Sequence, residues 1–120
     1  MVSEDLAGCL YLAECYNSRV EKKKPHYPLE LVKRLIVNEG RDPFTQSAKN
    51  GAAEMGLDAG ELRGIVTGLA MQDFYKSMTT HKSSRVWQDV YRPVTRLGAA
   101  YVKVTIYPEG NLIVVSFKGL

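Results

Sequence analysis

Basic side chains able to bind phosphate groups are concentrated in the last third of this 120-residue chain. Residues 76–120 contain seven Lys and Arg residues against two acidic residues, a net charge of +5. The whole chain has a formal net charge of only +3, because residues 1–19 contribute −2 and residues 20–75 are balanced. A modest total therefore does not exclude a protein that acts on a nucleic acid, whose phosphates attract clustered cations.

Tyr101 and Lys118 are predicted to face each other across a β-hairpin. The segments YVKVTIY and LIVVSFK alternate apolar and polar residues, and the sequence PEGN between them is typical of a turn. A turn centred on Glu109-Gly110 places Tyr101 directly opposite Lys118, with Cβ atoms about 4.5–5.5 Å apart. The phenol and the ammonium group then share a solvent-facing position. They form either a cross-strand packing pair or part of a functional site.

Helices are predicted to precede this hairpin, because apolar residues recur there at three- and four-residue spacing. The first expected helix covers residues 28–40, with Pro28 at the first helical position and Gly40 as a cap. The second covers residues 45–55, is interrupted by Gly51 and is closed by Gly56. The third covers residues 58–69 and is opened by an Asp58–Glu61 capping box. A further helical turn is expected before Lys76, where β structure begins. The segment VWQDVY predicts a strand. The order indicates one α+β domain, with N-terminal helices packed on a C-terminal antiparallel β-sheet.

Other classes of protein are excluded by length and pattern. A chain of 120 residues is too short for a TIM barrel, and no apolar run approaches the roughly 18–20 residues that span a bilayer. The acidic N-terminus argues against a secretory signal. Cys9 and Cys15 fit neither a zinc site nor a CxxC redox pair, which indicates reduced thiols in a cytoplasmic protein.

Four segments carry a resemblance to a known family: DFYKSMTT, WQDVYRP, YVKVT and IVVSFK. Together with VEKKKPHYPLELVKRLI and GLDAGELRGIVTGL, they resemble the MqsR toxins over about residues 20–118. These are mRNA interferases of bacterial type II toxin–antitoxin systems, related in fold to the RelE and YoeB ribonucleases. The resemblance implies a RelE/YoeB-like fold and an endoribonuclease that cleaves mRNA at short GC-containing sequences and arrests growth.

The same resemblance implies a catalytic set of Lys76, Gln88, Tyr101 and Lys118. In such an enzyme the RNA supplies its own nucleophile, the 2′-hydroxyl, so no metal or other cofactor is expected. The protein orients the phosphodiester, moves protons and stabilises charge on the phosphorane oxygens. Phenols ordinarily titrate near pH 10, so a tyrosine base needs cations beside it. The sequence does not decide which residue is the base and which the acid.

Further RNA contacts are expected from residues in the same third of the chain: Arg85, Arg92, Arg96, Lys103 and Tyr91. For Trp87 and Arg92 the sequence leaves two interpretations open. Trp87 either stacks on a base or belongs to the core, and Arg92 either binds phosphate or forms an ion pair with Asp89. His81 is a proton carrier in a basic loop, and the resemblance gives it no catalytic role.

The resemblance covers residues 20–120 as a single toxin domain and leaves residues 1–19 as an extension. That extension is either an additional helix or an over-extended reading of a chain that begins at Val20. The expected partners are mRNA and an MqsA-like antitoxin, with no membrane contact, and the free toxin is expected to be a monomer. The alternative function is a non-catalytic RNA-binding or interaction module with the same fold.

Overall fold

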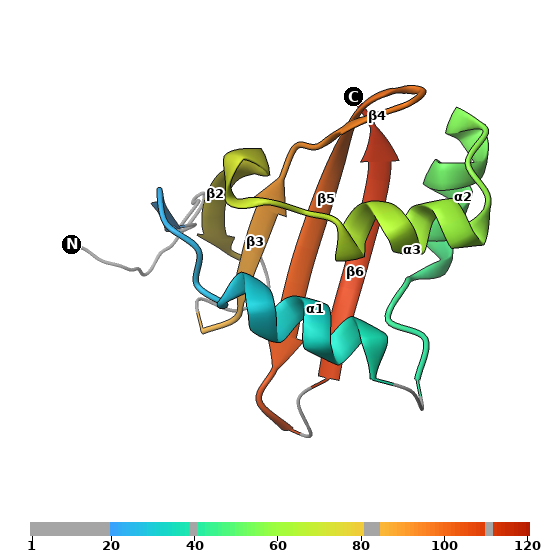
Figure 1. Cartoon of the computed structure of the whole chain (residues 1–120). Coiled ribbons are helices and arrows are strands. Elements are labelled where there is room, and N and C mark those ends of the chain that lie inside the picture. The colour runs from blue at the N-terminus through green and yellow to red at the C-terminus, as the bar shows by residue number, and fades with distance from the viewer. Residues whose placement is uncertain (1–19, 39–40, 81–84, 110–111) are drawn as a thin grey trace.

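The protein folds into an antiparallel sheet with helices beside it, as a computed structural model shows for residues 20–38, 41–80, 85–109 and 112–120 (Figure 1). The helices are α1 (Leu29–Val37), α2 (Gln46–Met55) and α3 (Ala59–Thr67), followed by the 3-10 turn η1 (Met71–Asp73). The strands are β1 (Glu21–Lys22), β2 (Phe74–Thr79), β3 (Trp87–Tyr91), β4 (Val94–Thr95), β5 (Gly98–Tyr107) and β6 (Leu112–Gly119). The predicted α+β class is confirmed.

The strands pair in the spatial order β1, β2, β3, β5 and β6, each antiparallel to its neighbour. The short strand β4 pairs with the beginning of β5, where it continues the line of β3 beyond Pro93. In the β5–β6 hairpin, Tyr101 lies opposite Lys118, so the predicted register is confirmed. Outside the named strands, Phe44 forms a parallel bridge with Val115 and extends the β6 edge.

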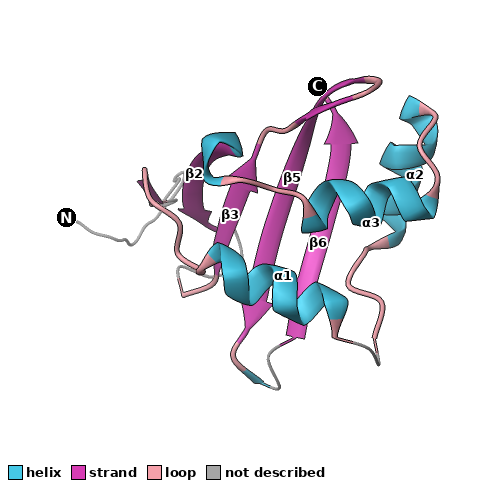
Figure 2. Cartoon of the chain, viewed as in Figure 1, coloured by secondary structure: helices cyan, strands magenta, loops and turns pink. Residues whose placement is uncertain are grey.

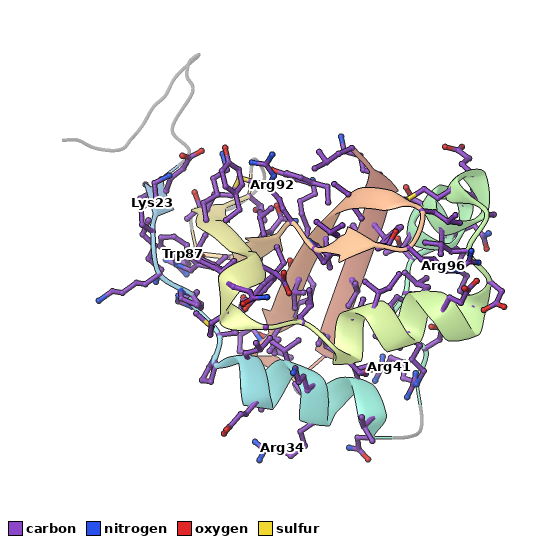
Figure 3. The ribbon with its side chains drawn as sticks, turned by 45° about the horizontal axis from the view of Figure 1, so that its top comes forward. Lys23, Arg34, Arg41, Trp87, Arg92 and Arg96 are labelled. Atoms are coloured by element: carbon purple, nitrogen blue, oxygen red, sulfur yellow. The ribbon has the colours of Figure 1, made fainter. Side chains whose placement is uncertain are left out.

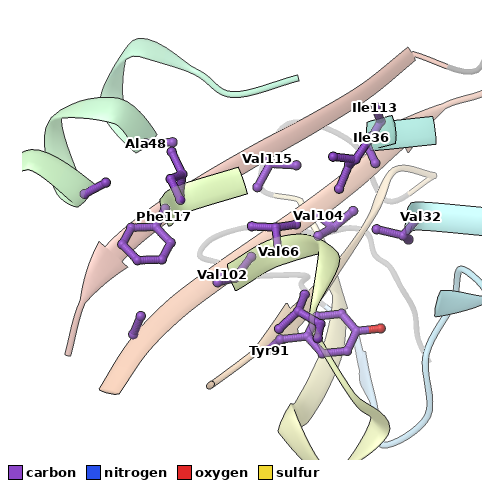
Figure 4. Close-up of a cluster of buried hydrophobic side chains, with 14 of the residues drawn as sticks. Val32, Ile36, Ala48, Val66, Tyr91, Val102, Val104, Ile113, Val115 and Phe117 are labelled. Carbon is purple, nitrogen blue, oxygen red and sulfur yellow. The ribbon is translucent and has the colours of Figure 1, made fainter. Parts of the chain in front are cut away.

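Helices α1 and α3 lie over one face of the sheet, and α2 lies beside β6 (Figure 2). The hydrophobic core fills the space between these elements (Figure 4). It joins Val32 and Ile36 of α1 and Leu62 and Val66 of α3 to the apolar residues of one sheet face, which include Tyr91, Val102, Val104, Val115 and Phe117. Alternation along β3, β5 and β6 sends these side chains inward, and the intervening residues face the opposite side.

The helix ends agree with the sequence except at α1. Thr45 and Gly56 cap α2, and Asp58 and Glu61 form the predicted capping box of α3. Pro28, however, is the N-cap of α1 rather than its first helical residue, so that prediction was wrong. It precedes the helix with an extended ψ of 133° and accepts hydrogen bonds from the first turn through its carbonyl oxygen.

Gly51 does not interrupt α2, which runs through it. The residue lies where the helix approaches β6 most closely, and a Cβ added there would overlap the carbonyl oxygen of Phe117. A helix-weakening residue is therefore used for backbone contact between α2 and the edge strand.

The expected helical turn before Lys76 was wrong in its extent. Only Met71–Asp73 forms a turn, and the strand begins at Phe74. Strand β1 lies just before α1, in a basic segment for which the sequence predicted no strand. Helix α1 ends at Val37 with Asn38 as its C-cap, so the prediction that Gly40 caps it was wrong. Predictions for residues 1–19, His81 and part of the PEGN turn lie outside the described residues. Within the described part, no helix is long and apolar enough to cross a membrane.

Candidate functional site

The four residues of the predicted catalytic set come from four strands and share one face of the sheet, which we call the open face. Lys76 lies on β2, Gln88 on β3, Tyr101 on β5 and Lys118 on β6. The strand register places them there, because paired residues lie on the same face of the sheet, as do residues two apart on one strand. Lys76 pairs with Val90, two residues from Gln88, and Val90 pairs with Lys103, two residues from Tyr101. Each of these four positions has a buried sequence neighbour on the other face of the sheet, in turn Ser77, Asp89, Val102 and Phe117. The described helices lie on the other face or along β6 (Figure 1).

Three of the four residues gather with three further side chains into what we call the cationic cluster: Lys23, Tyr75, Lys76, Arg92, Tyr101 and Lys118. The Tyr75 ring lies at its centre. Three cations stand within reach of that ring, with Lys23 Nζ at 5.6 Å, Lys76 Nζ at 5.4 Å and the Arg92 guanidinium carbon at 4.6 Å from its centroid. The Tyr101 ring meets Tyr75 edge-on at 6.4 Å.

Tyr101 connects the two ends of the cluster. Lys118 Nζ lies 5.6 Å from the centroid of the Tyr101 ring, so the predicted pair is in contact range across the hairpin. On the other side, the phenol interacts electrostatically with Lys76. A phenol among ammonium and guanidinium groups on an exposed sheet face can bind a phosphodiester and exchange a proton with it.

A β-bulge explains why Tyr75 and Lys76, although adjacent in sequence, both take part in the cluster. The register of β2 against β3 shifts between Phe74 and Lys76, so one extra residue is accommodated there. Bulges of this kind bend a strand and redirect a side chain. Strict alternation would have sent Tyr75 to the side opposite Lys76, whereas its ring contacts Lys76 and Tyr101.

Lys76 is held by a carboxylate from the neighbouring strand. Its ammonium group binds Glu21 Oε2 of β1 at 2.8 Å, and the lysine side chain is only 17% exposed. The hydrogen bond to Glu21 raises the pKa of Lys76 above its ordinary value, despite an opposing effect of burial. Lys76 is therefore a cation at neutral pH, suited to stabilising negative charge rather than to removing a proton.

Gln88 lies apart from the cluster. Gln88 pairs with Met78 of β2, whereas Tyr101 lies four residues further along the open face, which corresponds to about 13 Å at the usual rise per residue. Among the described residues, its side-chain amide has no hydrogen-bond partner. Val90 separates the two positions on β3 and is fully buried between Lys76 and Lys103, its partners in register.

The predicted RNA-contacting cations are dispersed. Arg92 belongs to the cluster, while Arg96 lies beside α3, away from Arg92 (Figure 3), and its Nε binds Glu61 Oε2 at 2.6 Å. That ion pair raises the pKa of Arg96 and lowers the pKa of Glu61. Lys103 lies on the open face of β5, and Arg85 is exposed just before β3.

The structure of β3 decides the roles of Tyr91 and Trp87. Tyr91 was predicted to contact RNA, which is wrong, because it is completely buried in the core against Phe74. Burial raises its pKa to about 12. Trp87 is only partly buried and stacks on His26, with Lys22 Nζ 4.2 Å from its ring centroid, so it is not a core residue.

The proposed ion pair between Arg92 and Asp89 is also wrong. Asp89 is completely buried on the helix side, where it accepts hydrogen bonds from Ser77 Oγ at 2.6 Å and from the backbone N–H groups of His26 and Tyr27 at 3.0 and 2.8 Å. Arg92 instead lies over Tyr75. Asp89 thus fixes the segment that follows β1, the strand that carries Glu21 to the site.

Sequence reasoning missed Tyr75 and Lys23. Both lie in the segments compared with the family, but nothing in their spacing indicated a role, because the bulge that redirects Tyr75 and the short strand that brings Lys23 near it are tertiary features. Among the described residues, no group of three or more His, Cys, Asp or Glu side chains is placed to hold a metal ion.

The family comparison covers this whole site except Glu21 and Lys23. Residues 24–119 match the family described as motility quorum-sensing regulator, toxin of MqsA. The chain is also 44% identical over 99 residues to the mRNA interferase toxin MqsR of Escherichia coli (strain K12). That alignment covers 82% of this chain and 98% of the relative.

Proposed function

Because the chain belongs to the MqsR toxin family, we propose that it is an mRNA interferase, the toxin of a type II toxin–antitoxin system. One observation carries the proposal beyond the family. Two phenols, three lysines and an arginine converge on one exposed patch of the sheet, the cationic cluster, where an RNA backbone can lie. The fold is then of the RelE/YoeB-like kind, and the enzyme acts in the cytoplasm as a free monomer.

The proposed reaction uses the 2′-hydroxyl of the RNA as the nucleophile. Its attack on the adjacent phosphorus forms a 2′,3′-cyclic phosphate and releases a 5′-hydroxyl. The 2′-hydroxyl loses a proton and the departing 5′-oxygen gains one, so the protein needs only proton carriers and cations, without a metal ion.

The residues predicted to act on RNA have separate proposed roles in this reaction. Lys76 and Lys118 stabilise the charge on the phosphorane oxygens, and the raised pKa of Lys76 keeps it protonated for that task. Tyr101 lies between them and exchanges the proton. Gln88, four residues further along the open face, holds a more distant part of the RNA, and Lys103 and Arg92 contact phosphates.

The partners follow from the family. We propose cleavage at short GC-containing sequences. We also propose neutralisation by an MqsA-like antitoxin, because the family is described as the toxin of MqsA. The alternative, a non-catalytic RNA-binding module, would use the same cations without turnover.

Purified protein and a labelled mRNA transcript test the proposal. Wild type is expected to cleave in the presence of EDTA and to leave cyclic phosphate ends, and a 2′-deoxy nucleotide at the cleavage position is expected to stop the reaction. Lys76→Ala and Tyr101→Phe are expected to lower kcat by about 100-fold or more, the usual contribution of acid–base and electrostatic groups.

Two matched controls distinguish chemistry from folding. Tyr107→Phe removes the same hydroxyl from the far end of β5 on the open face, and Lys33→Ala removes a lysine from α1. Both are expected to retain full activity. Salt-sensitive binding without cleavage by wild type would establish the binding-module alternative, and full activity of Tyr101→Phe would remove Tyr101 from the reaction.

A further inference from the structure

A hollow of about 350 Å³ lies on the open face directly beyond the cationic cluster. Tyr75 and Arg92 belong to both, so the hollow and the cluster are continuous. The volume is near the lower end of that found for small-molecule sites, which suits a single ring system.

The hollow exists because a small residue lies next to Tyr101 on the open face of β5, two positions earlier in the chain. Ala99 occupies the next position on that face of β5, and Val94 lies opposite it on β4. On the other side, the backbone N–H of Leu120 donates to the carbonyl oxygen of Ala99. Val94 and Leu120 are 83% and 63% exposed, so two apolar walls stand open to solvent on either side of a methyl group.

Polar groups from η1 line the outer edge. Asp73 accepts a hydrogen bond from the backbone N–H of Ala70 through Oδ2, which closes the turn. Its Oδ1 has no partner among the described residues. Gln72 lies beside it, exposed, and also lines the hollow. The edge therefore offers a carboxylate acceptor and an amide, which are the groups that recognise the hydrogen-bonding edge of a nucleobase.

We propose that this hollow binds one nucleobase of the RNA substrate, adjacent to the scissile phosphate, and thereby contributes to sequence specificity. The proposal rests on the ribonuclease function proposed above. Tyr75 and Arg92 present a ring and a guanidinium plane for stacking, while the cluster holds the neighbouring phosphate. Asp73 Oδ1 accepts from an amino group, so the subsite favours adenine, cytosine or guanine over uracil.

Filling the hollow tests this subsite. The substrates are a short RNA that contains the cleavage site and versions of it in which each base beside the scissile phosphate is replaced in turn by an abasic ribose. With wild type, one of these replacements is expected to lower kcat/KM by about 5- to 150-fold, the range for one base stack. With Ala99→Leu, intact RNA is expected to be cleaved more slowly, and the same replacement is expected to have almost no further effect.

Ala53→Leu, the same substitution at an exposed position of α2, is the control and should behave as wild type. Should Ala99→Leu retain the full abasic penalty, the subsite is elsewhere. If it weakens antitoxin binding but leaves RNA cleavage unchanged, the hollow is a protein contact and the proposal is wrong. Absence of any cleavage by wild type would instead refute the ribonuclease function itself.

Asp73→Asn provides an independent test that needs no new bulk. The asparagine oxygen must take the place of Oδ2 to keep the bond to Ala70, which turns the amide NH₂ towards the position of Oδ1. A donor then replaces an acceptor, and the preference at this position is expected to shift towards uracil. An unchanged preference, measured by sequencing the cleavage ends of a randomised RNA, would overturn the role of Asp73.

Discussion

Replacing Asp89 with asparagine is expected to lower the free energy of unfolding by about 2–3 kcal/mol. The Asp89 carboxylate is completely buried and accepts three hydrogen bonds, one from the Ser77 hydroxyl and two from the backbone of His26 and Tyr27. Through these bonds it joins β2, β3 and the segment after β1. The substitution changes one oxygen to an NH₂ group and leaves the shape almost unaltered.

The magnitude follows from the two carboxylate oxygens. Oδ1 accepts from Ser77 and His26, and Oδ2 accepts from Tyr27. Asparagine keeps the two bonds to its oxygen and places a donor against the Tyr27 N–H. One hydrogen bond to a charged acceptor, about 1.5–3 kcal/mol, is then lost. The two remaining bonds become neutral and weaker, and relief from burying a charge offsets part of that weakening.

Urea denaturation at neutral pH measures the effect, since the midpoint shifts while the slope stays constant in a two-state transition. Asp58→Asn is the matched control. It makes the same substitution at the exposed N-cap of α3, where Asn and Asp cap equally well, and should change stability by less than about 0.5 kcal/mol. If Asp89→Asn is no more destabilising than this control, the three hydrogen bonds do not hold the β1 segment, and our account of Asp89 is refuted.

Three further outcomes are expected. Glu21→Gln removes the carboxylate that competes with RNA phosphate for Lys76, so binding of a non-cleavable 2′-deoxy RNA should tighten by about two- to five-fold. Weaker binding in a titration would contradict this competition. Gly51→Ala should destabilise the protein by about 2 kcal/mol or more, because the added Cβ forces α2 away from β6. This loss outweighs the higher helix propensity of alanine. A raised Tm would disprove the close approach of α2 to β6. The pKa of His26 is lowered, first by burial and then by Lys22, so the folded protein favours the neutral imidazole and its stability should fall as the pH drops below the ordinary pKa of 6.5. His26→Gln should flatten that part of a curve of Tm against pH. An unchanged slope would assign the pH dependence to another group.

The hairpin register was predictable because it depends on local information. Period-two alternation fixes which residues of β5 face the core, and a short turn fixes which residue of β6 lies opposite each of them. Tyr101 and Lys118 were therefore paired correctly from the sequence alone. The α3 capping box was predictable for the same reason, since both of its partners lie within one turn.

The parts that failed depend on contacts between distant segments. Residues around Tyr75 alternate poorly because a bulge interrupts β2, so the sequence suggested a helical turn in place of a strand. Strand β1 has two residues and no pattern of its own. Tyr91 looked like a base-stacking residue because aromatic side chains serve both cores and RNA surfaces, and only the register of β3 against β5 assigns it to the core.

The motif WQDVYR illustrates how a single strand supports both the fold and the site. Its alternate residues Trp87, Asp89 and Tyr91 face the helix side, where Asp89 fixes the β1 segment and Tyr91 fills the core. The intervening Gln88 and Arg92 face the open side, and Arg92 joins the cluster. A one-residue shift of β3 would exchange these two sets and bury an arginine in the core. The buried carboxylate of Asp89 resists that shift, because only in the present register do Ser77 and the backbone of the β1 segment surround it. The geometry of the cationic cluster therefore depends on a residue that never touches the open face.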